Sequence, residues 1–410
     1  MPRHIGNTEF SNGDTMFRNY LKTTVRKIKQ QKLLSAINIF GLSLGIACVV
    51  LIYFFIKSEV TFDRFHRDSN RIYRVWLAVN FQGLEYWDTT PYPLAGALMN
   101  EFPGVESAAR FTKLLQAPVR LERNPVEASI HLVGPAFFEI FDFPLKSGRA
   151  ENALADPNAV IISEEIERAY FADKSAIGEI VSINLGGEQF TDFKIAGVAR
   201  AIPENSSIQF DLLISEQHFK TIFGEASLTS WFPKSSTVTF FKARPNANVT
   251  EIEQNMQPLA DQHNLTTMLR LAEIEKKFLV QNLKEVHFGK AINNRFLEPN
   301  GDPLYPFIMA GIALLVLAIA CINFMNLSVG LSGSRTKEVG VRKVFGAQRV
   351  QLMKQFWFES ILLAFIALVF GLLLAEFFLP AFNTLSGKNF TFSTAFDLIT
   401  VVTFGGMALA

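Results

Sequence analysis

Side chains that could catalyse a reaction or bind a metal are scattered along this 410-residue chain. An H-E-x-x-H pair on one helix face would indicate a zinc site, and a G-x-S-x-G elbow would indicate a nucleophilic serine. Neither pattern occurs between residues 57 and 304, the longest stretch without a long apolar run. The histidines in this stretch lack metal-ligand spacing; they are His66, His131, His218, His263 and His287. The sequence therefore predicts no catalytic residue, no metal site and no resident cofactor.

Other groups that could be reactive have simpler structural interpretations. Glu164–Glu167 gathers carboxylates, but after Ser163 it is typical of the first turn of an exposed helix, where the helix dipole favours acidic residues. We interpret His287, in KEVHFG, as a structural hydrogen-bonding residue rather than a proton carrier. Cys48 and Cys321 lie in apolar runs and predict neither a disulfide nor a thiolate metal site.

Long apolar runs dominate the organisation of the chain, in which 49% of residues are hydrophobic. Leu33–Ile56 is a run of 24 residues without a charged side chain, long enough for a helix to cross a bilayer. We predict transmembrane helices at 33–56, 305–331 and 356–379, and the start of a fourth at 395–410. Because this last run is cut off at the final residue, we expect the chain to be the front portion of a longer polypeptide.

Local charge predicts the orientation of these helices. Residues 16–32 include six basic side chains and no acidic one, and Ser334–Ser360 includes six basic and two acidic ones. Basic residues accumulate in cytoplasmic loops, so both segments are expected inside the cell. The resulting order is a cytoplasmic N-terminus (1–32), an extracytoplasmic domain (57–304), a cytoplasmic coupling loop (332–355) and an outer loop (380–394). The net charge of +1 gives no reason to expect a nucleic-acid partner.

The extracytoplasmic region alternates strand-like with helix-like runs, which predicts a mixed α/β domain. Strands are expected within 71–81, 158–163, 179–185, 192–200 and 236–243, and helices within 91–102, 163–171 and 248–263.

The basic segment also has an amphipathic pattern. Val341, Val344 and Phe345 are spaced i, i+3, i+4, which predicts a short helix ended by a left-handed Gly346 before a second helix enters the next span. A plain topology signal that contacts anionic lipid headgroups is an equally weighted interpretation of the charge.

Two patterns inside the predicted spans concern helix packing. Gly41 and Gly45 form a G-x-x-x-G motif, which either lets two helices approach closely or has no particular role. Asn323 and Asn326 share one helix face, and we interpret that face as a helix-helix contact rather than a transport pathway. The near absence of charge within the spans argues against a proton- or sodium-coupled carrier.

Ser334–Ser360 resembles the cytoplasmic loop of the FtsX-like permease domain found in MacB-type ABC transporters. The family pattern is a basic residue, here Arg335, followed by E-[IV]-G-[IV]-R-[KR]-x-x-G-A. The matching residues are Glu338, Gly340, Arg342, Lys343, Gly346 and Ala347. The segment from Met16 through the first apolar run resembles the first helix of the family, and Leu283–Gly289 resembles the end of its periplasmic core domain.

The resemblance implies a multi-pass α-helical membrane protein with a large extracytoplasmic mixed α/β domain of the MacB periplasmic core type. That domain is expected to have two lobes, with the smaller one inserted near Gly134–Ile214. The chain contains no G-x-x-x-x-G-K-[ST], so ATP hydrolysis is expected on a separate subunit. The layout resembles the first half of a long permease in which one helix, an outer domain and three helices occur twice.

The function implied is that of a permease that couples a separate ABC ATPase to movement of the outer domain, for efflux of drugs or peptides or for handling of lipoproteins. The other expected partners are membrane lipid, a second permease half or protomer, and a periplasmic adaptor. The expected location is the bacterial inner membrane, with the N-terminus in the cytoplasm. The alternative is a membrane-anchored receptor with a ligand-binding outer domain, which would require a cytoplasmic output domain beyond Ala410.

Overall fold

The structure is a computed structural model that describes Arg26, Gln30 and most of residues 32–392. Within that range it leaves out 81–83, 115–116, 122–123, 127, 150–152, 172–173, 187–188, 234, 263–275, 290–296, 298–300, 331–338, 342 and 347. The chain divides into two compact units. A helical unit comprises Met1–Val60 and Pro303–Ala410, and an α/β unit comprises Thr61–Asp302.

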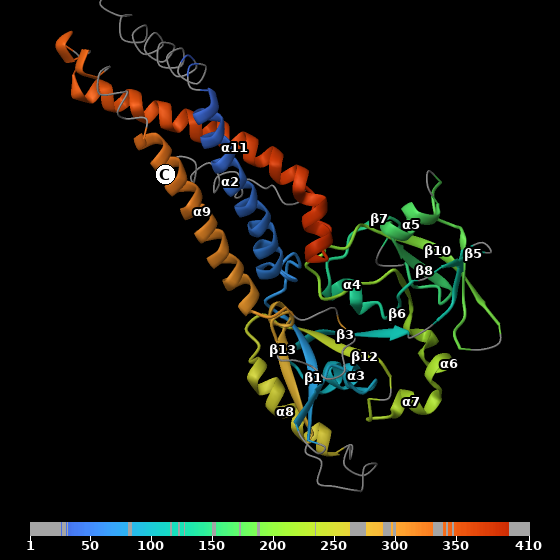
Figure 1. Cartoon of the computed structure of the whole chain (residues 1–410). Coiled ribbons are helices and arrows are strands. Elements are labelled where there is room, and N and C mark those ends of the chain that lie inside the picture. The colour runs from blue at the N-terminus through green and yellow to red at the C-terminus, as the bar shows by residue number, and fades with distance from the viewer. Residues whose placement is uncertain are drawn as a thin grey trace, which may run out of the picture. The chain divides into compact units, whose positions relative to one another are not determined.

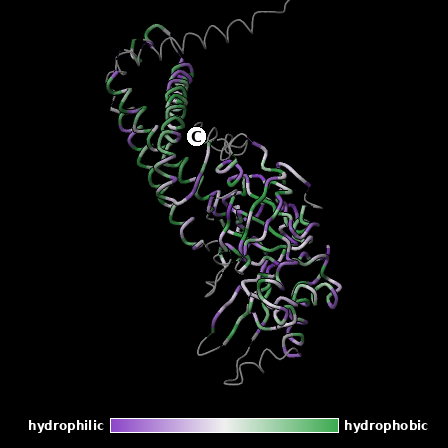
Figure 2. Tube along the Cα trace, turned by 90° about the vertical axis from the view of Figure 1, so that its right-hand side faces the viewer, coloured by the Kyte–Doolittle hydropathy of each residue, from purple (hydrophilic) through white to green (hydrophobic). Residues whose placement is uncertain are grey.

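The described part of the helical unit is built on α2 (Lys32–Val60), α9 (Leu304–Gly330) and α11 (Arg349–Ser386). Helix α2 packs against both α9 and α11 (Figure 1). All three helices are long and apolar enough to cross a bilayer. Figure 2 shows hydrophobic residues along the length of each. Many large apolar side chains of α9 and α11 are exposed, as expected for helices surrounded by lipid or by further helices.

Helix α11 is longer than the predicted span 356–379 because both of its ends are capped. Gln348 and Gln351 form a reciprocal capping box at its start, where each side chain accepts from the other residue's backbone N–H. At its end, Gly387 adopts a left-handed conformation with φ of 65° and its N–H bonds the carbonyl of Asn383.

The α/β unit contains a mixed sheet in which the structure describes thirteen strands. Its main path runs β13-β1-β12-β3-β6-β11-β8-β10-β9-β4-β5, with β2 beside β1 and β7 beside β10. Their bounds are β1 (Ile72–Asn80), β2 (Leu84–Trp87), β3 (Val105–Leu114), β4 (Val119–Leu121), β5 (Asn124–Val126), β6 (Ile130–Val133), β7 (Leu145–Ser147), β8 (Ala159–Ser163), β9 (Ile180–Ile183), β10 (Thr191–Ala199), β11 (Leu212–Ser215), β12 (Thr237–Ala243) and β13 (Lys276–Asn282).

Most neighbouring strands are antiparallel, but β6 and β11 are parallel, as are β8 and β10. Strands β6, β8 and β11 are buried along their whole length, so they are apolar without alternation. The helices of this unit are α3 (Leu94–Glu101), α4 (Ala136–Ile140), α5 (Glu164–Tyr170), α6 (Phe219–Phe223), α7 (Glu225–Thr229), α8 (Val249–Gln262) and the 3-10 turns η1 (Glu216–His218) and η2 (Leu283–Glu285).

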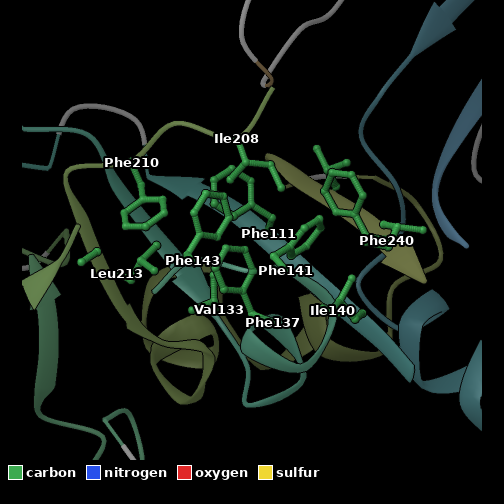
Figure 3. Packing of buried hydrophobic residues seen from close by; sticks show 14 of the residues in the cluster. Phe111, Val133, Phe137, Ile140, Phe141, Phe143, Ile208, Phe210, Leu213 and Phe240 are labelled. Atoms are coloured by element: carbon green, nitrogen blue, oxygen red, sulfur yellow. The ribbon is translucent and has the colours of Figure 1, made fainter. Parts of the chain in front are cut away.

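A phenylalanine-rich core fills the space between the sheet and α4. Phe137, Phe141 and Phe143 pack with Phe210 and Phe240, and several of these ring pairs meet edge to face (Figure 3). Such rings bury large areas in a fixed geometry, so this cluster holds the middle of the sheet rigidly. Separate apolar clusters lie under α3 and α8 and around β8–β11.

The predicted strands and helices of the α/β unit are all present, and Ser163 caps α5 by accepting a hydrogen bond from the Ile166 N–H. The predicted start of a fourth transmembrane helix at 395–410 lies outside the described residues. The prediction that an inserted lobe starts at Gly134 and ends at Ile214 is wrong about the start. Strands β4–β6 belong to the same apolar cluster as β8–β11, because β4 pairs with β9 (Val119 opposite Ile183). Helix α4, inside the predicted insert, packs in the central core instead, and one sheet runs through both halves of the unit.

Candidate functional site

The basic segment before α11 forms a helical turn that presents apolar side chains. Residues 339–341 and 343–344 are helical, and the Phe345 N–H bonds the Val341 carbonyl at 3.2 Å. Gly346 follows with φ of 86°, and among the described residues, its chain neighbours aside, no atom lies within 4 Å of the place where its Cβ would be. Val344 and Phe345 are each 86% exposed. The turn thus presents two exposed apolar side chains beside Lys343.

Three of the predicted coupling residues lie in this turn: Gly340, Lys343 and Gly346. Gly346 has the left-handed conformation that its C-cap role requires, and no described residue, apart from the chain neighbours and the backbone of its own helical turn, lies within 4 Å of a Cβ placed on Gly340. The other four lie outside the described residues: Arg335, Glu338, Arg342 and Ala347.

The glycines of the G-x-x-x-G motif lie against α9. A Cβ on Gly41 would approach the Asn323 Nδ2 to 2.8 Å, and a Cβ on Gly45 would approach the Ala320 Cβ to 2.6 Å. Neither distance leaves room for a side chain, so these glycines allow the two helix backbones to pack closely. Asn326, one turn after Asn323, is exposed on α9.

The same five residues, Gly41–Gly45, also spell G-x-S-x-G, the letters of a serine-hydrolase elbow. That motif requires a sharp turn between a strand and a helix. Here the residues lie inside the continuous helix α2, and the Ser43 hydroxyl donates to the Ile39 carbonyl at 2.6 Å. Ser43 is therefore a buried helix residue and not a nucleophile.

Helix α11 approaches α2 closely as well. A Cβ on Gly371 would lie 2.8 Å from the Ile46 side chain and 3.0 Å from the Ser43 carbonyl. Beyond the end of α11, the Lys388 Nζ lies 3.2 Å from the Glu59 Oε1 near the end of α2. The ion pair places the loop after α11 and the C-terminal end of α2 at the same end of the helical unit.

His287 joins the beginning and the end of the α/β unit. Its ring stacks on Phe62 with 3.6 Å between centroids and 4° between planes. Its carbonyl accepts a hydrogen bond from the Gly301 N–H at 2.8 Å. Thr61 is the first residue of this unit and Asp302 its last, so one residue contacts both ends of the polypeptide that forms it. We call Phe62, His287 and Gly301 the joint.

The residues around Phe62 are fixed to the loop that precedes β11. The Asn205 side-chain amide donates to the Thr61 carbonyl and hydroxyl, each at 3.0 Å. The Asp63 carboxylate accepts from the Ser207 N–H at 2.8 Å and from its hydroxyl at 2.6 Å. Asp63 holds a φ of 55°, which is uncommon outside glycine and best tolerated by Asp and Asn.

Burial shifts the ionisation of the groups near the joint. Burial raises the pKa of Asp63 to about 6, although the hydrogen bonds from Ser207 oppose this shift. His66 accepts the Asp142 N–H through its Nδ1, and burial lowers its pKa to about 4. Burial lowers the pKa of Arg74 to about 10, and its guanidinium donates to Gln281. At neutral pH Asp63 and Arg74 are therefore charged although buried, whereas His66 is neutral.

The part of the chain that the structure describes holds no group of three or more potential metal ligands. The predicted carboxylate run lies on α5, where Glu164 and Glu167 form ion pairs with Lys146. Burial and the nearby Lys113 lower the pKa of His131 to about 3, and its ring stacks on Phe111 inside the sheet. His263 lies outside the described residues.

Sequence reasoning did not find the joint or the clamp at Asp63. His287 stood out through the KEVHFG stretch, but its partner Phe62 is separated from it by almost the whole unit. Phe62 and Asp63 follow the first apolar run after five further residues, and no local pattern in the sequence marks either side chain as buried.

Two family models match the chain. The MacB-like periplasmic core domain matches residues 35–259, and the FtsX-like permease C-terminal domain matches residues 310–410. Together they cover the described helices and most of the sheet.

Similar curated proteins include two macrolide export ATP-binding/permease proteins MacB. The one from Aggregatibacter actinomycetemcomitans is 25% identical over 253 residues, which are 60% of this chain and 35% of the relative. The one from Agrobacterium fabrum is 25% identical over 300 residues, which are 71% of this chain and 41% of the relative. The chain thus spans less than half the length of either.

Similar solved structures are of isolated domains. A domain of a putative permease protein from Porphyromonas gingivalis is 23% identical, with a TM-score of 0.47, over 59% of this chain and 98% of that one. The periplasmic region of MacB from Actinobacillus actinomycetemcomitans is 15% identical, with a TM-score of 0.38, over 53% and 91%.

Proposed function

Because the chain belongs to the family of FtsX-like permeases that carry a MacB-like periplasmic core domain, we propose that it is the permease subunit of an ABC transporter. In this proposal the chain is not an enzyme. ATP is hydrolysed by an ABC ATPase, which we propose is a separate subunit; the 410 residues themselves contain no phosphate-binding G-x-x-x-x-G-K-[ST].

The proposed action is mechanical. Closure of an ATPase dimer displaces the coupling turn around Gly340–Gly346, and the stiff helices α9 and α11 transmit that displacement toward the α/β unit. The moving α/β unit then drives efflux of drugs or peptides, or handles lipoproteins, on the outer side of the membrane. In this proposal the spans alternate across the bacterial inner membrane, with the coupling turn in the cytoplasm and the α/β unit in the periplasm.

The joint is the observation that carries this proposal. A displacement can act on a domain as a whole only if the segments that enter and leave it are fixed to the same rigid point. His287 supplies that point by contacting Phe62 near the start of the unit and Gly301 near its end. The buried clamp of Asp63 on Ser207 attaches the joint to the sheet.

The exposed surfaces of the helical unit suggest which partners it binds in this proposal. The exposed Val344 and Phe345 support docking of the ATPase, with the flanking basic residues near anionic lipid. The exposed apolar faces of α9 and α11 support contact with lipid and with a second permease half or protomer. A periplasmic adaptor on the α/β unit completes the proposed assembly.

A membrane-anchored receptor is the second candidate function. It would use the same α/β unit to bind a ligand and would signal inward through the helices, which requires a cytoplasmic output domain. Sequence beyond Ala410 separates the two: a second helix and outer domain supports the permease, whereas a kinase or cyclase domain supports the receptor.

Copurification from native membranes tests the proposed function. The tagged chain should retain an ATPase subunit with a G-x-x-x-x-G-K-[ST] motif, and Glu338→Ala or Arg342→Ala should release it. A cysteine in place of Gln348 should react with a membrane-impermeant thiol reagent only in inside-out vesicles. Labelling of that cysteine in intact cells, or an ATPase that remains bound to both variants, would overturn the proposal.

A further inference from the structure

A cavity of about 580 Å³ in the α/β unit has no role in the mechanical proposal. Its wall is mainly aromatic and apolar, with charged side chains on three residues. The lining residues are Phe65, Arg67, Phe138, Phe141, Asp142, Phe143, Pro144, Arg200, Ala201 and Pro203. Its volume falls within the roughly 300–1,000 Å³ typical of small-molecule sites, which are mostly apolar with a few placed polar groups.

The charges around this cavity do not cancel. Arg67 is paired with Asp142, because its Nε lies 2.8 Å from the Asp142 Oδ1 and its backbone N–H bonds the other carboxylate oxygen. Arg200 has no ion pair with any residue that the structure describes. Its neighbour Ala201 donates its N–H to Glu164, but that carboxylate is already paired with Lys146 and Arg168.

The apolar wall is held in a fixed shape. Phe141 and Phe143 continue into the phenylalanine-rich core (Figure 3). Buried His66 packs its ring against both of them and lies 4.0 Å from the ring of Phe65. Its Nδ1 also fixes the backbone of Asp142. A wall that is braced in this way keeps the cavity open without reorganisation, which favours binding.

We propose that this cavity binds a fatty acid, with the acyl chain against Phe65, Phe138 and Phe143 and the carboxylate on Arg200. An apolar wall with one uncompensated guanidinium is complementary to a chain with one negative group at its end. Arg200 is exposed and stays hydrated beside a neutral lipid, which would make no charge-assisted contact with it, whereas a hydrophilic anion would leave the aromatic wall uncovered. The inference does not depend on the proposed ATPase coupling.

Photoaffinity labelling tests this binding. The full chain is placed in nanodiscs of a zwitterionic lipid and exposed to a palmitic acid that carries a diazirine in its chain. Illumination should attach the probe within residues 138–144 or 200–203, and unlabelled palmitate should compete. The alcohol with the same diazirine chain should label this site about tenfold less, since it lacks the charge-assisted contact to Arg200.

Two variants and a matched control locate the binding. Arg200→Gln should reduce labelling by the acid about tenfold, and Ala201→Trp should block it by filling an exposed part of the cavity. Arg244→Gln, which changes an exposed arginine bound to the Pro103 carbonyl, should label as the wild type does. Equal labelling by acid and alcohol, or unchanged labelling of both cavity variants, would overturn the proposal.

Discussion

The ring of Phe62 lies flat on the imidazole of His287, with 3.6 Å between their centroids, although 225 positions separate them in the sequence. Because Gly301 bonds the carbonyl of the same histidine, this contact closes the α/β unit where the chain enters and leaves it. A closed unit can respond as one body to a force on either connection.

The stacked ring at the joint is therefore expected to contribute to the stability of the α/β unit. Replacement His287→Ala should lower the free energy of unfolding by about 2–4 kcal/mol, because it removes a buried ring and its stacked contact. His287→Phe should retain most of the stability. Denaturant unfolding followed by tryptophan fluorescence measures both, because three of the four tryptophans, Trp76, Trp87 and Trp231, lie in this unit. Equal losses in the two variants would show that the ring contact is unimportant.

The clamp at Asp63 predicts different effects for two substitutions. Asp63→Ala loses both hydrogen bonds from Ser207 and places alanine at a positive φ, so unfolding should become easier by roughly 2–4 kcal/mol. Asp63→Asn tolerates this φ and keeps hydrogen-bonding groups, so its loss should be smaller.

The pH dependence of the Asp63→Asn variant follows from the raised pKa. Folding raises the pKa of Asp63 from 3.8 to about 6, so its contribution to stability is full below 3.8 and falls as pH rises through 6. The stability of the Asn variant relative to the wild type should therefore improve as pH rises from about 4 to about 7. If the difference in stability between the Asn variant and the wild type stayed constant across that range, the raised pKa of Asp63 would be contradicted.

His131 predicts a loss of stability in acid. Its pKa falls from 6.5 to about 3 on folding because burial favours the neutral ring. The contribution of the neutral His131 ring to the free energy of unfolding is therefore fully present above pH 6.5 and is lost as the pH falls toward 3. His131→Phe keeps a ring on Phe111 and should reduce the acid-induced drop in melting temperature. Leu132→Met, a neighbour that does not titrate, serves as the control and should retain the wild-type acid profile.

Helix packing in the helical unit predicts a steric effect at Gly45. Gly45→Leu should destabilise the protein by about 1–3 kcal/mol, because a Cβ there would lie 2.6 Å from the Ala320 Cβ. Gly311→Leu, on an open face of α9, should have little effect. Gly45→Ala should be partly rescued by Ala320→Gly. Thermal unfolding of the full chain in detergent measures each, and a double variant no better than Gly45→Ala alone would argue against direct contact.

Local patterns in the sequence predicted the elements that have strong periodicity. Long apolar runs predicted α2, α9 and α11. Alternating apolar and polar residues, or short continuous apolar runs, predicted β1, β8, β9, β10 and β12. Short strands such as β4 and β5 have no such signal, and their pairing with β9 depends on contacts between distant residues. This is why the start of the inserted lobe was misplaced.

The candidate site also contains one part that local sequence predicts and another part that depends on contacts between distant residues. The coupling turn is a local motif, so its helix and the left-handed Gly346 follow from residue types alone. The joint and the clamp at Asp63 exist only when residues more than 140 positions apart meet, as the separation of Asp63 and Ser207 shows. A single sequence contains no periodic signal for such pairs.

The central claim is that a separate ATPase acts on the coupling turn, and photocrosslinking from Phe345 tests it most directly. A photoreactive phenylalanine analogue is placed at Phe345 and, as a control, at Leu385, which is equally exposed near the other end of α11. We predict an adduct between position 345 and a polypeptide that contains G-x-x-x-x-G-K-[ST], and none from position 385. The absence of such an adduct at 345, or the same adduct from both positions, would contradict the account.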